Sequence, residues 1–141
     1  MKKTRIILVE PLQLLADSIQ AIFQQKEKME VVAPYQSGDD CIHHLTRRFP
    51  DLLLISQNLP DMNGLECCRQ IHLQIPQLPI LIWGNDWSAS LLHIALQHGA
   101  RGILEKTIDS HELYRLIQMC LKGMTVFSSG LTERFLFGKH L

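Results

Sequence analysis

Residues 50–66 read PDLLLISQNLPDMNGLE, and they contain the signals of two successive secondary-structure elements. Its four consecutive apolar residues, 52–55, form a continuous rather than an alternating run, as expected of a strand that is buried on both faces of a sheet. Asn63 then precedes Glu66 by three residues, the spacing of a helix N-cap followed by an acid in the first turn. The stretch therefore predicts a buried strand, a short polar loop and a helix, in that order.

Units of the same kind recur on both sides of this stretch. Further continuous apolar runs are expected to form strands at residues 6–9, 31–33, 80–83 and 102–104. Between the runs, apolar side chains recur at the spacing of one helix face, in groups at residues 15–23, 42–49, 65–75, 92–96 and 113–121. Short connections between alternating strands and helices predict right-handed crossovers and a parallel sheet covered on both faces, a three-layer α/β sandwich.

The ends of these elements indicate where a site would lie. Helix starts are marked by an N-cap residue three positions before an acid at 37–40, 63–66 and 109–112, and Gly99 is a C-cap candidate for the fourth helix. Ligands of an open parallel sheet bind beyond the carboxyl ends of its strands. The candidate site therefore consists of the residues at those ends, namely Glu10, Pro11, Ser56, Gly84 and Lys106.

The composition is that of one soluble globular domain. Of 141 residues, 46% are apolar and 20% are charged, and 14 basic side chains balance 14 acidic ones. Zero net charge disfavours direct nucleic-acid binding, whose affinity rests on neutralising phosphates. No apolar run approaches the roughly 20 residues of a membrane span, and the first apolar stretch ends at Glu10, too soon for a signal peptide. We therefore expect a cytoplasmic protein without membrane contact.

Neither the cysteines nor the histidines have the spacing of a metal site. Cys41, Cys67, Cys68 and Cys120 lie in apolar or helical stretches and are expected to be reduced core residues, with a redox sensor at the adjacent pair as the alternative. The two histidines at 43–44 would point about 100° apart on a helix. We expect neither a bound metal nor another cofactor.

The stretch 50–66, together with 6–10 and 99–106, resembles the receiver domain of bacterial response regulators. Its run Leu-Pro-x-Met-x-Gly-Leu-Glu is specific in order and spacing, and the run Gly-Ala-x-Gly-x-Leu-x-Lys at 99–106 supports it independently. The resemblance extends over residues 4–123, and receivers joined to LuxR-type helix-turn-helix domains are most similar. It implies a flavodoxin-like (βα)5 fold with strand order 2-1-3-4-5.

The chain departs from the receiver pattern where the resemblance implies chemistry. Ser56 stands at the position of the phosphoacceptor aspartate, and a serine hydroxyl is a weak nucleophile without an activating base. Of the acid pair that holds magnesium in receivers, Glu10 remains but Pro11 fills the second place. Because Mg²⁺ requires several hard oxygen ligands, we expect neither a magnesium site nor phosphorylation. The main interpretation of Ser56 is a hydrogen-bonding residue at the strand end, with a modified serine as the alternative.

Two positions of the receiver switch have also lost their usual side chains. In receivers, a Ser or Thr at the end of the fourth strand turns towards the phosphate and an aromatic residue on the fifth strand moves inward, whereas this chain has Gly84 and Ile103 there. Lys106 is retained, and we expect it to pair with Glu10 or a backbone carbonyl, because a half-buried ammonium must be paired or hydrated. The resemblance thus implies a pseudo-receiver, a receiver fold without phosphorylation chemistry.

Three side chains near these positions have distinct interpretations. Asp61, in the loop after the third strand, is expected to be a solvated turn residue, with a substitute phosphoacceptor as the alternative. Trp83 is expected to end a buried strand. Trp87, at the start of the fourth helix, is interpreted as an exposed interface anchor.

We divide the chain into a receiver-like domain, residues 1–123, and a C-terminal extension, residues 124–141. Residues 125–127 resemble the extended exit of LuxR-type receivers, and residues 131–137 have the pattern of a short amphipathic helix. Its apolar residues 135–137 are expected to pack on the domain, on a second copy or on a missing neighbour.

These observations predict a signalling module of a bacterial transcription regulator that acts without phosphorylation, through a protein partner or through homodimer formation. The expected surfaces are the fourth and fifth helices with the fifth strand, or the first and fifth helices. A DNA-binding output domain after Leu141 is the other partner considered, and no catalytic residue is expected. The alternative is a small-molecule-sensing domain with a pocket at the carboxyl edge of the sheet, where Pro11, Ser56 and Gly84 replace larger or more charged groups.

Overall fold

Strand β3 lies in the middle of a parallel sheet, and all of its residues are buried, as its continuous apolar run requires. The computed structural model describes residues 2–26, 28–32 and 34–136. The sheet order is β2-β1-β3-β4-β5-β6, which confirms the predicted sandwich and adds a sixth strand at the edge. The strands are β1 (Thr4–Val9), β2 (Met29–Val31), β3 (Leu52–Ser56), β4 (Ile80–Gly84), β5 (Gly102–Glu105) and β6 (Val126–Phe127).

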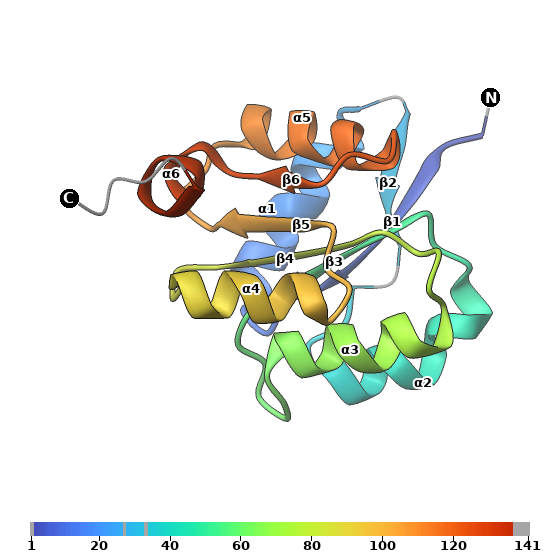
Figure 1. The fold of residues 1–141 in the computed structure, drawn as a ribbon. Coiled ribbons are helices and arrows are strands. Elements are labelled where there is room, and N and C mark those ends of the chain that lie inside the picture. The colour runs from blue at the N-terminus through green and yellow to red at the C-terminus, as the bar shows by residue number, and fades with distance from the viewer. Residues whose placement is uncertain (1, 27, 33, 137–141) are drawn as a thin grey trace.

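Helices cover the sheet on both faces, with α1 and α5 on one face and α2, α3 and α4 on the other (Figure 1). Strand side chains alternate between two buried clusters, so that Leu8 packs with α1 and α5 whereas Val9 packs with the opposite helices. The helices are α1 (Gln13–Gln24), α2 (Gly38–Arg48), α3 (Gly64–Gln74), α4 (Ala89–Gln97), α5 (Ser110–Leu121) and α6 (Ser129–Leu131), with a π-helical turn, η1 (Thr132–Leu136), after α6.

The predicted helix caps are confirmed. Ser37, Asn63 and Asp109 precede α2, α3 and α5, and each side chain accepts a hydrogen bond from a backbone N–H of the first turn. Gly99 follows α4 with a φ of +102°, and a side chain there would overlap the His72 ring. A fourth cap, Ser88 at the start of α4, has no acid three positions later and was not marked by the sequence pattern.

Strand β2 lies two residues earlier than the predicted run at 31–33. Its ladder joins Met29 to Thr4 and Val31 to Ile6, and residue 33 lies outside the described part of the chain. The edge position explains the difference, because β2 pairs with β1 alone and its limits follow the register of that single neighbour.

The C-terminal extension packs on the sheet. Residues 126 and 127 pair with Gly102 and Ile103 of β5, so the extended exit becomes β6. The expected helix over 131–137 begins earlier, at Ser129, and is π-helical from Thr132. Leu131 is fully buried and Phe135 packs against the same cluster, whereas Phe137 and the side chain of Leu136 lie outside the described residues. The division at residue 123 stays a prediction.

All four cysteines are free and buried. Burial raises the pKa of the Cys67 thiol to about 12, and the charges of Asp61 and Glu66 add to this effect. Burial likewise raises the pKa of Cys68 to about 12, with a smaller contribution from Cys67. Both thiols are therefore protonated at neutral pH, which favours core packing over the redox-sensor alternative.

In the described ranges, which omit residues 1, 27, 33 and 137–141, every helix is too short or too polar to span a bilayer.

Candidate functional site

Glu10, Ser56 and Lys106 meet at the carboxyl edge of the sheet. Each lies two positions after a strand residue of the cluster beneath α1 and α5, and side chains two positions apart point to the same face. The strands β1 and β3 are neighbours, and Lys106 follows β5 beyond β4. The order of the strands and the alternation of side chains thus bring together residues that are about 50 positions apart in the chain.

Lys106 links the other two residues. Its Nζ lies 2.8 Å from Glu10 Oε1 and donates a hydrogen bond of 2.8 Å to Ser56 Oγ. The second carboxylate oxygen of Glu10 accepts a hydrogen bond of 3.0 Å from the Leu12 N–H. Glu10 is 1% exposed and Ser56 2%, so these contacts are sheltered from water. The expected pairing of Lys106 with Glu10 is confirmed.

The polar groups at this edge are already paired with one another. Ser56 Oγ faces an ammonium group, which can only donate hydrogen bonds and cannot accept the hydroxyl proton while it is charged. The Glu10 carboxylate is already neutralised by Lys106, and Pro11 has no side-chain oxygen. Among the described residues, no group of three or more His, Cys, Asp or Glu side chains is placed to hold a metal ion.

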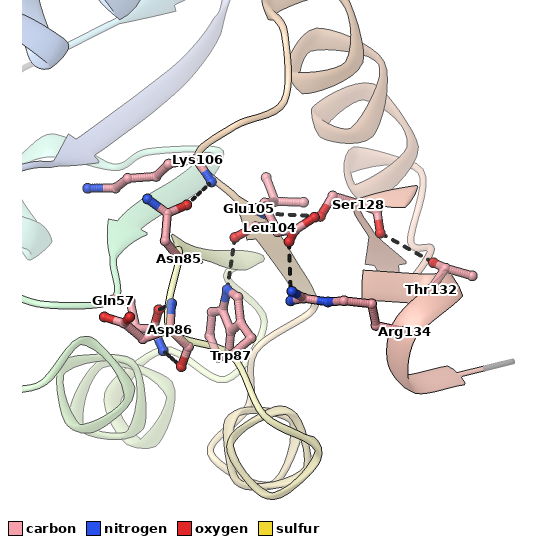
Figure 2. Close-up of polar contacts among 10 residues, drawn as sticks. All are labelled: Gln57, Asn85, Asp86, Trp87, Leu104, Glu105, Lys106, Ser128, Thr132 and Arg134. Atoms are coloured by element: carbon pink, nitrogen blue, oxygen red, sulfur yellow. Dashed lines mark hydrogen bonds and ion pairs between the residues drawn. The ribbon is translucent and has the colours of Figure 1, made fainter. Parts of the chain in front are cut away.

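Gln57 occupies the space beside Gly84 on the opposite face of the sheet. Its Nε2 donates to the Asp86 carbonyl at 2.9 Å, and its Oε1 accepts from the Asp86 N–H at 3.1 Å (Figure 2). A Cβ atom at Gly84 would overlap the Gln57 side chain, so a Ser or Thr does not fit there while Gln57 holds this position. The sequence pattern did not single out Gln57. The pairing of Ser56 with Trp83 places the residues that follow them, Gln57 and Gly84, side by side.

The loop 85–88, between β4 and α4, is tied to β5 as well as to β3. Asn85 Oδ1 accepts a hydrogen bond from the Lys106 N–H at 3.2 Å, and Trp87 Nε1 donates to the Leu104 carbonyl at 3.0 Å (Figure 2). The interpretation of Trp87 as an exposed interface anchor is therefore wrong: it is 7% exposed, because its ring packs in the core and its N–H finds a backbone acceptor. Trp83 is buried near the end of β4, as expected.

Ile103, at the second switch position, is buried beside the C-terminal segment. Its carbonyl accepts a hydrogen bond of 3.2 Å from the Ser128 N–H. Two further contacts hold the segment on β5: Ser128 Oγ accepts from the Glu105 N–H at 3.0 Å, and Arg134 lies 3.3 Å from the Glu105 carboxylate (Figure 2). The edge of β5 is thus covered by β6 and α6.

Asp61 is exposed, as expected, but its carboxylate also has a structural partner. Its two oxygens accept hydrogen bonds from the N–H groups of Gly38 at 3.0 Å and Asp39 at 2.8 Å, at the start of α2. Desolvation raises the pKa of Asp61, but the hydrogen bonds from Asp39 and Gly38 outweigh it and hold the pKa below its ordinary value. Asp61 therefore stabilises the N-terminus of α2.

Comparison with known proteins agrees with the fold. The Response regulator receiver domain model matches residues 6–118. The transcriptional regulatory protein DegU of Brevibacillus brevis is 26% identical over 121 residues, which are 86% of this chain and 51% of DegU. A protein-glutamate methylesterase/protein-glutamine glutaminase of Paramagnetospirillum magneticum is 30% identical over 110 residues, 76% of this chain and 31% of that protein. The crystal structure of a two-component response regulator of the LuxR family from an Aurantimonas species superposes with a TM-score of 0.91 at 21% identity and covers 99% of this chain and 100% of its own.

The extent of these matches limits what they establish. The chain spans 51% to 61% of the length of the transcriptional regulators DegU, LnrK and MctR. The structural likeness at 21% identity establishes the fold alone. The receiver model, however, matches far more than half of the chain, and this protein belongs to the family of response regulator receiver domains.

Proposed function

We propose that this chain is a pseudo-receiver, the regulatory module of a bacterial transcription regulator that acts through protein contacts without being phosphorylated. The observation that carries the proposal is the Lys106 ammonium, which lies between the Glu10 carboxylate and Ser56 Oγ at 2.8 Å from each. Within this trio the charges cancel, and a phosphoryl group would have to displace contacts that are already made inside the protein.

The chemistry of Ser56 supports the same reading. A carboxylate attacks a phosphoryl donor as an anion, whereas a serine hydroxyl needs a base. The nearest partner of Ser56 Oγ is a cation, and the one acid of the trio is held by Lys106 and the Leu12 N–H. For the same reason we expect no catalytic activity from this chain. A modified Ser56 stays an alternative prediction.

Incubation with acetyl phosphate and Mg²⁺, followed by intact-mass measurement, tests the proposal. We expect no mass gain, because the site has neither the nucleophile nor the metal ligands. A receiver that has the acid pair and the phosphoacceptor aspartate is the positive control. The matched control is the Pro11→Asp/Ser56→Asp double variant, which returns two carboxylates to the edge beside Glu10. A gain of one phosphoryl group on the unaltered chain would overturn the proposal.

The relatives support a role in transcription. Several are transcriptional regulatory proteins of which this chain spans little more than half. We therefore propose that the module works in the cytoplasm with a C-terminal DNA-binding output domain. With 14 basic and 14 acidic residues, the chain itself lacks the excess positive charge of a nucleic-acid binder.

Homodimer formation through α1 and α5 is part of the proposal. The alternative surface, which includes β5, is occupied in part by β6 and α6, and Leu131 is fully buried there. At the start of α1, Leu12 is 59% exposed and Leu14 is 76% exposed. Apolar side chains of this size in water favour a contact with another protein surface.

The small-molecule alternative stays a prediction. At the carboxyl edge, the Lys106 side chain contacts Ser56 and the Gln57 side chain fills the space beside Gly84, so both positions that were expected to widen a pocket are occupied. A cavity of about 410 Å³ lies at the opposite edge of the sheet, between the C-terminal ends of α2 and α3, and is lined in part by Phe49, Asp51 and Leu78. Its position is away from Glu10 and Ser56.

A further inference from the structure

Gln57 joins the end of β3 to the loop 85–88 through both ends of its side-chain amide. The amide donates to the carbonyl of Asp86 and accepts from the N–H of the same residue, at 2.9 and 3.1 Å. One side chain therefore satisfies both backbone groups of a loop residue, in the manner of a neighbouring strand. Gln57 is only 4% exposed, so water does not compete freely for these groups.

Gly84 makes this arrangement possible. The Gln57 side chain lies against the backbone of Gly84, and any Cβ atom there would overlap it. Gln57 and Gly84 thus form a matched pair: the glutamine is held in a space that exists only because the glycine has no side chain.

The loop is held on its other side as well. There, Trp87 Nε1 donates to the carbonyl of Leu104, and Asn85 Oδ1 accepts from the N–H of Lys106. On the side of β3, Asn58 Nδ2 adds a hydrogen bond of 3.2 Å to the Asp86 carboxylate. Residues 85–87 are therefore hydrogen-bonded to the ends of both β3 and β5, on either side of their own strand. Figure 2 shows Gln57 and Trp87 reaching to opposite sides of this loop.

We infer that Gln57 is a conformational lock that holds the loop 85–88, and with it the start of α4, in one arrangement without any bound phosphoryl group. This inference rests on the proposed function in one respect, namely that the chain is not phosphorylated. Moving the loop away from β3 breaks both hydrogen bonds of Gln57 and leaves its buried amide without partners. A partner that binds this arrangement of the loop finds nearly all molecules already in it. A partner that needs another arrangement must first break the hydrogen bonds of Gln57, and its affinity is lower for that reason.

Amide hydrogen exchange, read residue by residue by NMR, tests the lock on the full chain without phosphate or metal. Gln57→Ala is expected to speed exchange at Asp86 by about tenfold or more, because two hydrogen bonds of ordinary strength are lost. Gln57→Glu keeps the size of the side chain but places a carboxylate oxygen against the Asp86 carbonyl, so it is also expected to speed exchange. Gln74→Ala, an exposed glutamine of α3, is the matched control and should leave the loop unchanged.

Unchanged exchange at Asp86 in folded Gln57→Ala would overturn the inference. If Gln57→Ala does not fold, Gln57→Glu decides, and equal exchange in that variant and the unaltered chain overturns it. Adding Mg²⁺ and beryllofluoride separates this result from the proposed function. Extra loop protection by these ions would contradict the proposed function, while the exchange rates measured without them would still decide the lock.

Discussion

At the end of β4, the absent side chain of Gly84 and the buried side chain of Gln57 depend on each other. Gln57 is hydrogen-bonded through both amide atoms, so it cannot move aside cheaply to admit a Cβ atom. The missing hydroxyl at Gly84 is therefore matched by the Gln57 side chain, which follows the neighbouring strand β3 and fills the space beside Gly84. On the other face of the sheet, Lys106 makes a similar internal pairing with Glu10 and Ser56.

A double-mutant cycle tests this dependence at the residue scale. Gly84→Ala is expected to destabilise the chain by about 1–3 kcal/mol, the ordinary cost of overpacking a buried position. In the Gln57→Ala background the same change is expected to cost less by about 1 kcal/mol or more, because the clashing side chain is gone. Urea denaturation of the four proteins measures both costs, and additive effects of the two changes would contradict the pairing.

At the scale of elements, α2 is capped by two side chains. Ser37 Oγ accepts a hydrogen bond from the Asp40 N–H at 3.2 Å. The Asp61 carboxylate accepts from the N–H groups of the two residues that precede Asp40 in the helix. A carboxylate at a helix N-terminus also interacts favourably with the helix dipole. Asp61 thus joins the loop after β3 to the start of a helix more than 20 residues earlier in the chain.

Asp61→Ala is expected to lower the free energy of unfolding by about 1 kcal/mol at neutral pH, the usual effect of losing an N-cap. Since the pKa of Asp61 is lowered in the folded state, its contribution is complete above the pKa of the unfolded chain and is lost as the pH falls through the folded value. Urea denaturation at neutral and acidic pH measures the difference, and Glu133→Ala, an exposed acid of η1, is the control. A difference that grows on acidification would contradict the assigned role.

In the whole molecule, residues 126–136 cover the β5 edge of the sheet and so limit which faces another protein could contact. Ser128 and Arg134 hold it against β5, and Leu131 fills the cluster beside α4. The face of α1 and α5 carries no such cover among the described residues, and the exposed side chains of Leu12 and Leu14 stand at the start of α1.

Analytical ultracentrifugation of the full chain tests self-association. We expect a concentration-dependent dimer that Leu14→Asp weakens by about tenfold or more, because a charge would replace a large apolar side chain in the contact. Leu73→Asp, at a similarly exposed leucine on α3 of the opposite face, is the matched control, and its dimer should dissociate like that of the unaltered chain. A monomer at the highest concentration, or a dimer weakened by Leu73→Asp alone, would contradict the proposed face.

The amino-acid sequence alone predicted the sandwich, the strand order implied by the receiver resemblance, the caps of three helices and a site that contains Glu10, Ser56 and Lys106. The strand order was implied by the resemblance alone, whereas the other features follow from local apolar runs, capping residues and the alternation of side chains, which span only a few positions each. The roles of Gln57 and Trp87 and the edge strand β6 emerged from the three-dimensional structure. Their partners are backbone groups of distant segments, and such pairing depends on the distances between packed strands, which no local pattern encodes.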